Sequence, residues 1–210
     1  MDQADSEIII RFIESNDIPE VSLLHLNYLK TSFSKNNASL KLLNLYYLSL
    51  IKIGEIALAA VSSGKIIGYV AFVTSIKKIY LYQLKNYLIK SLYYNIILSF
   101  LDPIVQFRNI LLRIKQFFSF SNKANENILD KFRGIPELRP IVVDYNHQGK
   151  GVAKLLILKA EELLRAKNVR QYFLRVEMEN KRAVRFYEKM EFIPAGHESP
   201  GVMIMVKNIS

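Results

Sequence analysis

The sequence contains no cysteine among its 210 residues. Disulfides, zinc sites with thiolate ligands and a cysteine nucleophile are therefore excluded, and a reducing compartment is permitted. Acidic residues are scarce as well, because 19 Asp and Glu stand against 29 Lys and Arg, which gives a formal net charge of +10. This balance favours an anionic partner, such as a nucleotide, a membrane surface or RNA.

Signals for secretion and for a membrane span are also missing. The N-terminus reads MDQADSE and lacks the basic and apolar regions of a secretory signal, so we expect a cytoplasmic protein. Within residues 76–134 the longest uncharged run is Ser91 to Leu101. That run is well short of the ~20 residues that a transmembrane helix needs.

Three further motifs are absent. The sequence has no G-x-x-x-x-G-K-[ST] loop, no G-x-G-x-x-G fingerprint and no G-x-S-x-G elbow. A P-loop nucleotide site, a dinucleotide site of the Rossmann type and a serine nucleophile of the hydrolase type are therefore disfavoured.

The apolar pattern predicts strands and helices in the alternation that is typical of a mixed α/β layer. The expected elements are a strand at residues 7–13, a helix that begins near Asp17 and Pro19, a helix at 40–51, a β-hairpin at 56–61 and 66–73 that turns at Gly64, a strand at 172–176 and a final apolar run at 202–206.

The most informative stretch joins a strand to a helix. The apolar run Pro140 to Val143 is followed by a polar turn and by QGKGVA, Gln148 to Ala153, whose two glycines free the backbone immediately before a helix. Apolar residues then recur at helical spacing as far as Leu164. The first turn of a helix has N–H groups without partners and the positive end of the helix dipole. We therefore expect a phosphate or pyrophosphate to bind there.

From these residues onward the sequence resembles the GNAT superfamily of acyl-coenzyme A dependent N-acetyltransferases. The family's phosphate loop has the form Gln/Arg-x-x-Gly-x-Gly/Ala, as at Gln148 to Ala153. The segment from Asn180 to Phe192 is similar to the family's N-x-x-A-x-x-F-Y-x-x-x-G-F signature, with Glu191 in place of the usual glycine. Weaker similarity covers Glu7 to Val73. Residues 76–134 have no counterpart in the family's minimal fold.

The resemblance implies a GNAT-like α/β fold with a mixed sheet and acetyl-CoA as the acetyl donor. It also implies a single domain over residues 1–210, with 76–134 as a basic, apolar helical insertion. In the family, one strand parts from its neighbour at a bulge and pairs with the pantetheine arm of coenzyme A. The residues that correspond to this strand are Ile141, Val142 and Val143.

The remaining cofactor contacts implied by the resemblance are in the phosphate loop and at a family asparagine: Gln148, Gly149, Lys150, Gly151, Val152, Ala153 and Asn180. Two of these residues have a second interpretation. Lys150 is equally compatible with a solvated loop lysine, and Asn180 with an ordinary helix N-cap.

Two catalytic residues are implied by the resemblance. Tyr187 matches a tyrosine that in many members donates a proton to the departing thiolate, although it is also compatible with a core aromatic beside Phe186. Glu137 aligns with a carboxylate that in some members is the general base for the acceptor ammonium. The alternative roles of Glu137 are substrate binding and pairing with Arg139. His197 is a weaker candidate, in a loop near the acceptor side, and no metal site is expected.

Residues 76–134 carry ten basic and three acidic residues, a net of +7. We expect one helix with an apolar face from Ile76 to Leu92, ended by Asp102 and Pro103, and a second helix at 104–118. An apolar stripe is usually core, which favours a hairpin that packs on the domain, forms a homodimer contact or covers the acceptor site. The alternative is a basic amphipathic segment on an anionic membrane surface.

The sequence thus predicts an N-acetyltransferase that moves an acetyl group from acetyl-CoA to a primary amine by direct transfer, because no cysteine is present to form an acyl intermediate. The acceptor is a small-molecule or protein amine. The alternative function is a regulatory or peripheral membrane module that binds acyl-CoA without turnover. No nucleic acid partner is expected, since the basic residues interleave with apolar ones.

Overall fold

The computed structural model describes residues 7–29, 36–101 and 128–209. The chain forms two compact units. The sheet unit comprises Met1–Phe12, Glu55–Ser75 and Asn127–Ser210, and the helical unit comprises Ile13–Gly54 and Ile76–Glu126.

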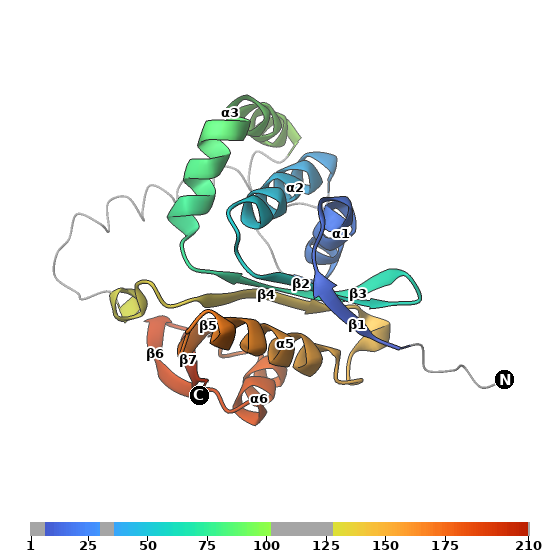
Figure 1. Cartoon of the computed structure of the whole chain (residues 1–210). Coiled ribbons are helices and arrows are strands. Elements are labelled where there is room, and N and C mark those ends of the chain that lie inside the picture. Colours follow the sequence, from blue (N-terminus) through green and yellow to red (C-terminus); the bar gives the residue numbers. More distant parts are fainter. Residues whose placement is uncertain (1–6, 30–35, 102–127, 210) are drawn as a thin grey trace. The chain divides into compact units, whose positions relative to one another are not determined.

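The described part of the sheet unit is organised around one mixed sheet with the strand order β1-β2-β3-β4-β5-β7-β6 (Figure 1). Neighbouring strands are antiparallel, except β4 and β5, which are parallel. The strands are β1 (Ile9–Phe12), β2 (Ala57–Ser62), β3 (Lys65–Val73), β4 (Glu137–Val143), β5 (Gln171–Glu177), β6 (Ile193–Ser199) and β7 (Val202–Asn208). Parallel neighbours need a crossover, and α5 (Val152–Ala166) lies in the connection from β4 to β5.

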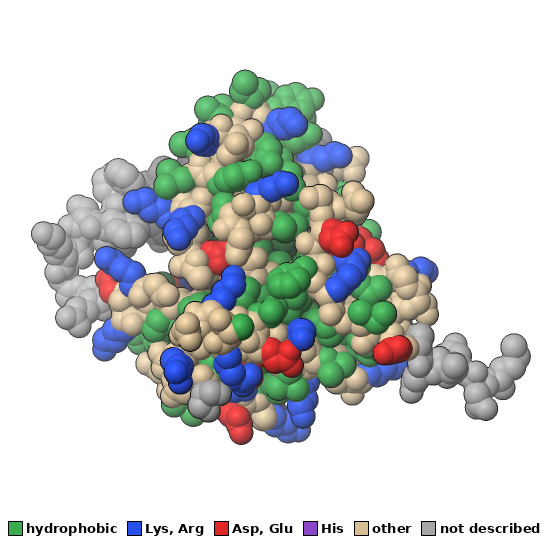
Figure 2. All heavy atoms as spheres, viewed as in Figure 1, with side chains coloured by type: hydrophobic (Ala, Val, Ile, Leu, Met, Phe, Trp, Pro, Cys, Tyr) green, Lys and Arg blue, Asp and Glu red, His purple; other side chains and the backbone are tan. Residues whose placement is uncertain are grey.

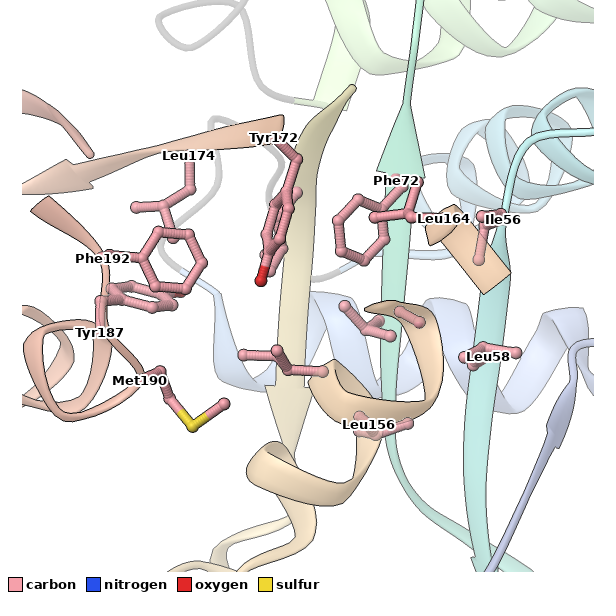
Figure 3. Packing of buried hydrophobic residues seen from close by; sticks show 14 of the residues in the cluster. Ile56, Leu58, Phe72, Leu156, Leu164, Tyr172, Leu174, Tyr187, Met190 and Phe192 are labelled. Atoms are coloured by element: carbon pink, nitrogen blue, oxygen red, sulfur yellow. The ribbon is translucent and has the colours of Figure 1, made fainter. Parts of the chain in front are cut away.

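One face of this sheet packs with α5 and α6 (Lys181–Lys189) to form the main hydrophobic core (Figure 3). Leu156 and Leu164 from α5 are buried together with Phe72 from β3 and Leu174 from β5. Burial of one such side chain stabilises the fold by about 1.5–3 kcal/mol. The helical period of α5 therefore fixes which side of the helix meets the sheet.

A buried polar cluster attaches the second half of α5 to β5 and β7. The Glu161 carboxylate accepts a hydrogen bond from the Tyr172 hydroxyl at 2.6 Å and pairs with Lys207 Nζ at 2.7 Å. Tyr172 and Lys207 face each other in the β5–β7 register. Because a buried charge is tolerated only with partners, this pairing specifies how α5 sits on the sheet.

The other face of β5 and β7 carries the short helix η2 (Ile128–Phe132). Phe173, Ile204 and Val206 form a second apolar cluster there, and the rings of Phe132 and Phe173 lie with their centroids 4.8 Å apart. Odd-numbered residues of β5 therefore point to the η2 face, as the two-residue period of a strand requires.

The helical unit contains η1 (Ser15–Asp17), α1 (Ile18–Tyr28), α2 (Asn37–Lys52) and α3 (Ile76–Leu101). The Asn36 side chain caps α2 by accepting a hydrogen bond from Ser39 N at 2.9 Å. His25 Nδ1 and the Tyr47 hydroxyl, 2.6 Å apart, join α1 to α2. Within α3, the backbone of Tyr87 departs from helical geometry, so the helix is kinked at that residue. Among the described residues, no helix has both the length and the apolar character that crossing a membrane requires.

The structure confirms most of the expected elements, including the first strand, the two helices after it and the hairpin of β2 and β3. The second insertion helix, expected at 104–118, lies outside the described residues. The loop expected around His197 is wrong, because residues 193–199 form strand β6. The sequence does not predict this strand because it contains Pro194, Gly196 and several polar residues. An edge strand tolerates all of them.

The expectation that the apolar face of α3 packs on the domain is wrong for most of its residues, whereas a homodimer contact through this face stays a prediction. Ile79 is buried, but Tyr80, Leu84, Leu88 and Leu92 are exposed. Helical spacing shows which side chains share a face, and it does not show whether that face is covered.

Candidate active site

Strands β4 and β5 separate almost as soon as they meet (Figure 3). Their parallel pairing consists of one register pair, Glu137 with Phe173, whereas β4 stays paired with β3 as far as Val143. Among the described strands, none pairs with the other edge of β4 from 138 to 143. The backbone groups on that edge are therefore able to bond an extended ligand as a neighbouring strand would.

A bulge in β4 lies beside the point of separation. Val70 of β3 faces Ile141 and Phe72 faces Leu138, so the two residues Arg139 and Pro140 oppose the single residue between Val70 and Phe72. A bulge bends the strand that carries it, and proline has no N–H to contribute to a ladder. Gly68 lets the two strands approach closely, because a Cβ on it would lie 2.8 Å from the Val142 carbonyl oxygen.

The chain then turns through η3 (Tyr145–His147) into α5. Gly149 has φ 81° and Gly151, the N-cap of α5, has φ 80°, a region that favours glycine. Gly151 has no side chain with which to cap the helix, and its carbonyl oxygen accepts from Leu155 N at 3.0 Å. The N–H groups of the first turn thus remain without intrahelical partners. A Cβ added at either glycine would meet no atom within 4 Å, so the space beside both glycines is open.

Gln148 connects this loop to its surroundings. Its Nε2 donates to the Val143 carbonyl oxygen at 3.0 Å, and its Oε1 accepts from Arg182 Nη1 at 2.8 Å. The end of β4, the loop and the start of α6 are therefore joined through one side chain. The Gln148 amide is occupied by this bridge on both of its sides.

A charged cluster lies at the opposite end of β4. Glu137, 8% exposed, accepts hydrogen bonds at Oε1 from Arg139 Nε and from Arg175 Nε, each at 2.8 Å. Arg175 Nη1 also donates to Glu198 Oε1 at 2.8 Å. Burial raises the pKa of Glu137 above its ordinary value, against the opposing effect of Arg175. Carboxylates with a raised pKa are suited to proton transfer near neutral pH.

Helix α6 supplies two further polar side chains. Asn180 Oδ1 accepts from Ala183 N at 3.1 Å, which confirms the N-cap interpretation of this residue. Tyr187 is buried between Phe186 and Phe192, at centroid distances of 5.3 and 5.4 Å. Burial raises the pKa of Tyr187 to about 12, so its hydroxyl is protonated at neutral pH.

Residues 120–192 match the Acetyltransferase (GNAT) family. This segment is about a third of the chain and contains β4, the phosphate loop, α5, β5 and α6. The match confirms the resemblance in the sequence and indicates an acyltransferase enzyme. Acetyl-CoA is the acetyl donor that the GNAT family uses.

Solved structures share the fold of this chain. An N-acetyltransferase from Staphylococcus aureus Mu50 has a TM-score of 0.62 at 13% identity, with 98% of this chain and 100% of that chain covered. A putative acetyltransferase from Salmonella typhimurium, solved with its cofactor acetyl-CoA, has a TM-score of 0.58 at 13% identity, with 97% and 94% covered. A ribosomal-protein-alanine N-acetyltransferase from Brucella melitensis has a TM-score of 0.58 at 15% identity, with 95% and 99% covered. A search of curated protein sequences found no significant match.

The structure places the expected site residues of the GNAT domain in three groups. Ile141, Val142 and Val143 lie on the unpaired edge of β4, and the phosphate-loop residues follow directly, with Lys150 exposed and Val152 buried. Asn180 is the N-cap of α6 and Tyr187 lies within this helix, which Arg182 links to the loop. Glu137 stands apart at the other end of β4, and His197 is exposed on β6.

Three polar residues of the site were not anticipated from the sequence. Arg175 and Glu198 belong to the cluster around Glu137, and Arg182 holds Gln148. Arg175 lies 38 residues from Glu137, and only the parallel register of β4 and β5 brings them together. A charged residue inside the apolar strand 172–176 was the available signal, because such a residue requires a partner when buried.

Proposed function

We propose that this GNAT protein is an N-acetyltransferase that moves an acetyl group from acetyl-CoA to a primary amine by direct transfer. The observation that carries the proposal is the separation of β4 from β5 at a bulge, followed directly by a helix start with unpartnered N–H groups. The unpaired edge of β4 is thus followed directly along the chain by a site that can bind an anion. From Glu137 to Val143 the strand rises about 20 Å, at ~3.3 Å per residue, which suits a long arm with a charged end.

The donor is held by two kinds of backbone contact in this proposal. N–H groups from Gly149 to Ala153 bind the pyrophosphate, and exposed Lys150 adds positive charge. Ile141 to Val143 bond the pantetheine arm along the free edge of β4. The Asn180 oxygen caps α6, so its amide nitrogen is the atom available for the cofactor.

Glu137 is the proposed general base. Both arginines bind Oε1, which leaves Oε2 as the oxygen that takes a proton from the acceptor ammonium. The neutral amine nitrogen then attacks the thioester carbonyl carbon, and the C–S bond breaks as the new C–N bond is completed. The pairing with Arg139 and Arg175 is also compatible with a purely structural role, which Glu137→Gln distinguishes from the base role.

Tyr187 is the proposed acid for the departing thiolate. Its hydroxyl is in the protonated form that an acid requires. With a pKa of about 12 it is a weaker acid than an ordinary tyrosine, so it acts first by hydrogen bonding to the sulfur as negative charge develops.

We further propose that the two compact units make one acetyltransferase domain, with 76–134 as its insertion. The chain passes from one unit to the other after Phe12, Gly54, Ser75 and Glu126. Units built from interleaved segments do not have the single linker that separates independently folding domains.

Release of free thiol from acetyl-CoA tests the proposed activity. The purified protein is mixed with acetyl-CoA and with amines of several classes, including polyamines, amino sugars, amino acids and peptides with an N-terminal alanine. The peptide is included because a ribosomal-protein-alanine N-acetyltransferase shares the fold. We expect acceptor-dependent release with at least one class. Binding of acetyl-CoA without release for any amine supports the regulatory alternative, and absence of both binding and release refutes the proposal.

A further inference from the structure

Helix α3 presents a continuous apolar face to its surroundings. After the kink at Tyr87, six large apolar side chains recur at helical spacing, and each is between 44% and 83% exposed: Leu88, Ile89, Leu92, Tyr93, Ile96 and Phe100. We call these residues the α3 stripe. Single exposed apolar residues are ordinary on a protein surface, whereas a contiguous set of this size marks an interaction site.

The charge on α3 is of one sign. The helix carries four lysines, all exposed, and no acidic residue between Ile76 and Leu101: Lys77, Lys78, Lys85 and Lys90. In Figure 2, hydrophobic and basic side chains adjoin over α3 at the top of the view. A partner of this surface therefore has to offer both apolar groups and negative charge.

A cavity of about 330 Å³ between α2 and α3 adjoins the α3 stripe. Ile89 and Tyr93 line it and are also members of the stripe, while Lys41 and Lys90 provide an ammonium group from each helix. Asn44 lines the cavity too, and its buried Oδ1 has no hydrogen-bond partner among the described residues. Because two lysines line this cavity and no acidic residue does, an anionic ligand fits it.

We propose that α3 docks on a membrane surface that contains anionic phospholipids. The α3 stripe enters the boundary between head groups and acyl chains, with the helix in the plane of the surface. The lysines meet the negative surface potential, with their aliphatic stems along the apolar face and their ammonium groups in water. A head-group phosphate is held between Lys41 and Lys90.

The lipid surface explains the observations better than other partners do. A nucleic acid accounts for the lysines but leaves six apolar side chains in water. A second copy of this chain accounts for the stripe but brings the same four lysines, without acidic residues, against each other. An anionic bilayer satisfies both features.

Flotation of the full chain with vesicles tests this proposal independently of acetyl transfer. We expect the protein to float with vesicles of phosphatidylcholine and about 30% phosphatidylglycerol, and not with phosphatidylcholine alone. Raising the ionic strength from about 0.1 M to about 1 M shortens the Debye length from about 10 Å to about 3 Å and should release most of the bound protein.

Matched variants locate the contact. Lys90→Glu should lower partitioning by about tenfold or more, because it reverses a charge that faces the anionic surface. Ile89→Asp should have a similar effect, because it places a negative charge in the α3 stripe. The controls are Ile193→Asp on β6, at a residue 58% exposed, and Lys65→Glu at the start of β3. Thermal melting verifies that all four variants are folded.

Three results overturn the proposal. The first is wild-type protein that does not float with anionic vesicles. The second is an equal loss of flotation in the variants of α3 and in their controls, because binding would then depend on the net charge of the protein and not on α3. The third is self-association without lipid that Ile89→Asp abolishes, in a protein that does not float, because the α3 stripe is then an interface between copies. Thiol release has no part in these outcomes, so failure here leaves the proposed enzyme activity untouched.

Discussion

Glu137→Gln separates the proposed base role from a structural role. The substitution keeps the size of the side chain and an oxygen that accepts hydrogen bonds, but removes the negative charge. General-base catalysis contributes about 10²–10⁴-fold to the rate, so turnover should fall by that factor. Acetyl-CoA affinity should be little changed, because the cofactor contacts proposed above lie further along β4 and in the phosphate loop.

The expected cost in stability follows from the partners of Glu137. Removing one member of a buried ion pair typically costs about 3–5 kcal/mol when the other charge is left uncompensated. Here Arg175 keeps Glu198 at 2.8 Å, and the Arg139 side chain is 32% exposed to water. Burial raises the pKa of Glu137 and so offsets part of what the negative charge gains from its two arginines. We therefore expect a loss of about 1 kcal/mol or less in the free energy of unfolding.

The pH dependence of kcat/KM also tests the base role of Glu137, because the direction of the change can be predicted. Only the deprotonated carboxylate is a base, so kcat/KM of the wild type should decrease as the pH falls through the raised pKa of Glu137, above the ordinary carboxyl range. This acid limb should disappear in Glu137→Gln. The matched control is Glu198→Gln, which also removes a carboxylate partner of Arg175. Steady-state thiol release is the assay. Activity of Glu137→Gln within about threefold of wild type, or an equal loss in Glu198→Gln, refutes the base assignment.

Two substitutions test the remaining site groups. Tyr187→Phe should lower kcat by about 10–100-fold with acetyl-CoA affinity unchanged, because the ring still fills its place in the core and only the proton donor is lost; an unchanged kcat removes the acid assignment. Gly151→Ala should weaken acetyl-CoA binding by about tenfold or more, measured by calorimetry, because a Cβ obstructs the approach of the phosphate to the helix start. The control is Gly54→Ala. Gly54 also has a positive φ, 79°, and no atom within 4 Å of an added Cβ. The substitution should therefore cost the same backbone strain of about 1–2 kcal/mol, but at a position away from the proposed phosphate site. Equal affinities in the two glycine variants place the pyrophosphate elsewhere.

Local signals made the loop and helix of the proposed cofactor site predictable from the sequence. The backbone at residues 149 and 151 has positive φ angles, which favour glycine. The helical spacing of apolar residues in α5 can be seen within one short segment, without knowledge of distant contacts. The hairpin of β2 and β3 was predictable for the same reason, because Ser63 and Gly64 supply both positive φ angles of a tight turn.

Pairings between distant segments were not predictable. The contact of Glu137 with Arg175 depends on the single register pair of β4 and β5, and the contact of Gln148 with Arg182 joins segments 34 residues apart. The exposure of the α3 stripe was not predictable from the sequence either. An amphipathic period identifies a face, whereas its covering depends on elements elsewhere in the chain.

The central claim is that acetyl-CoA lies along the free edge of β4 with its pyrophosphate at the start of α5. A crystal structure with coenzyme A bound tests this claim most directly. We predict pantetheine amides within hydrogen-bond distance of the backbone of Ile141 to Val143, and pyrophosphate oxygens on the N–H groups of Gly149 to Ala153. Coenzyme A bound away from these residues, or β4 and β5 closed into a continuous ladder beneath it, contradicts the claim.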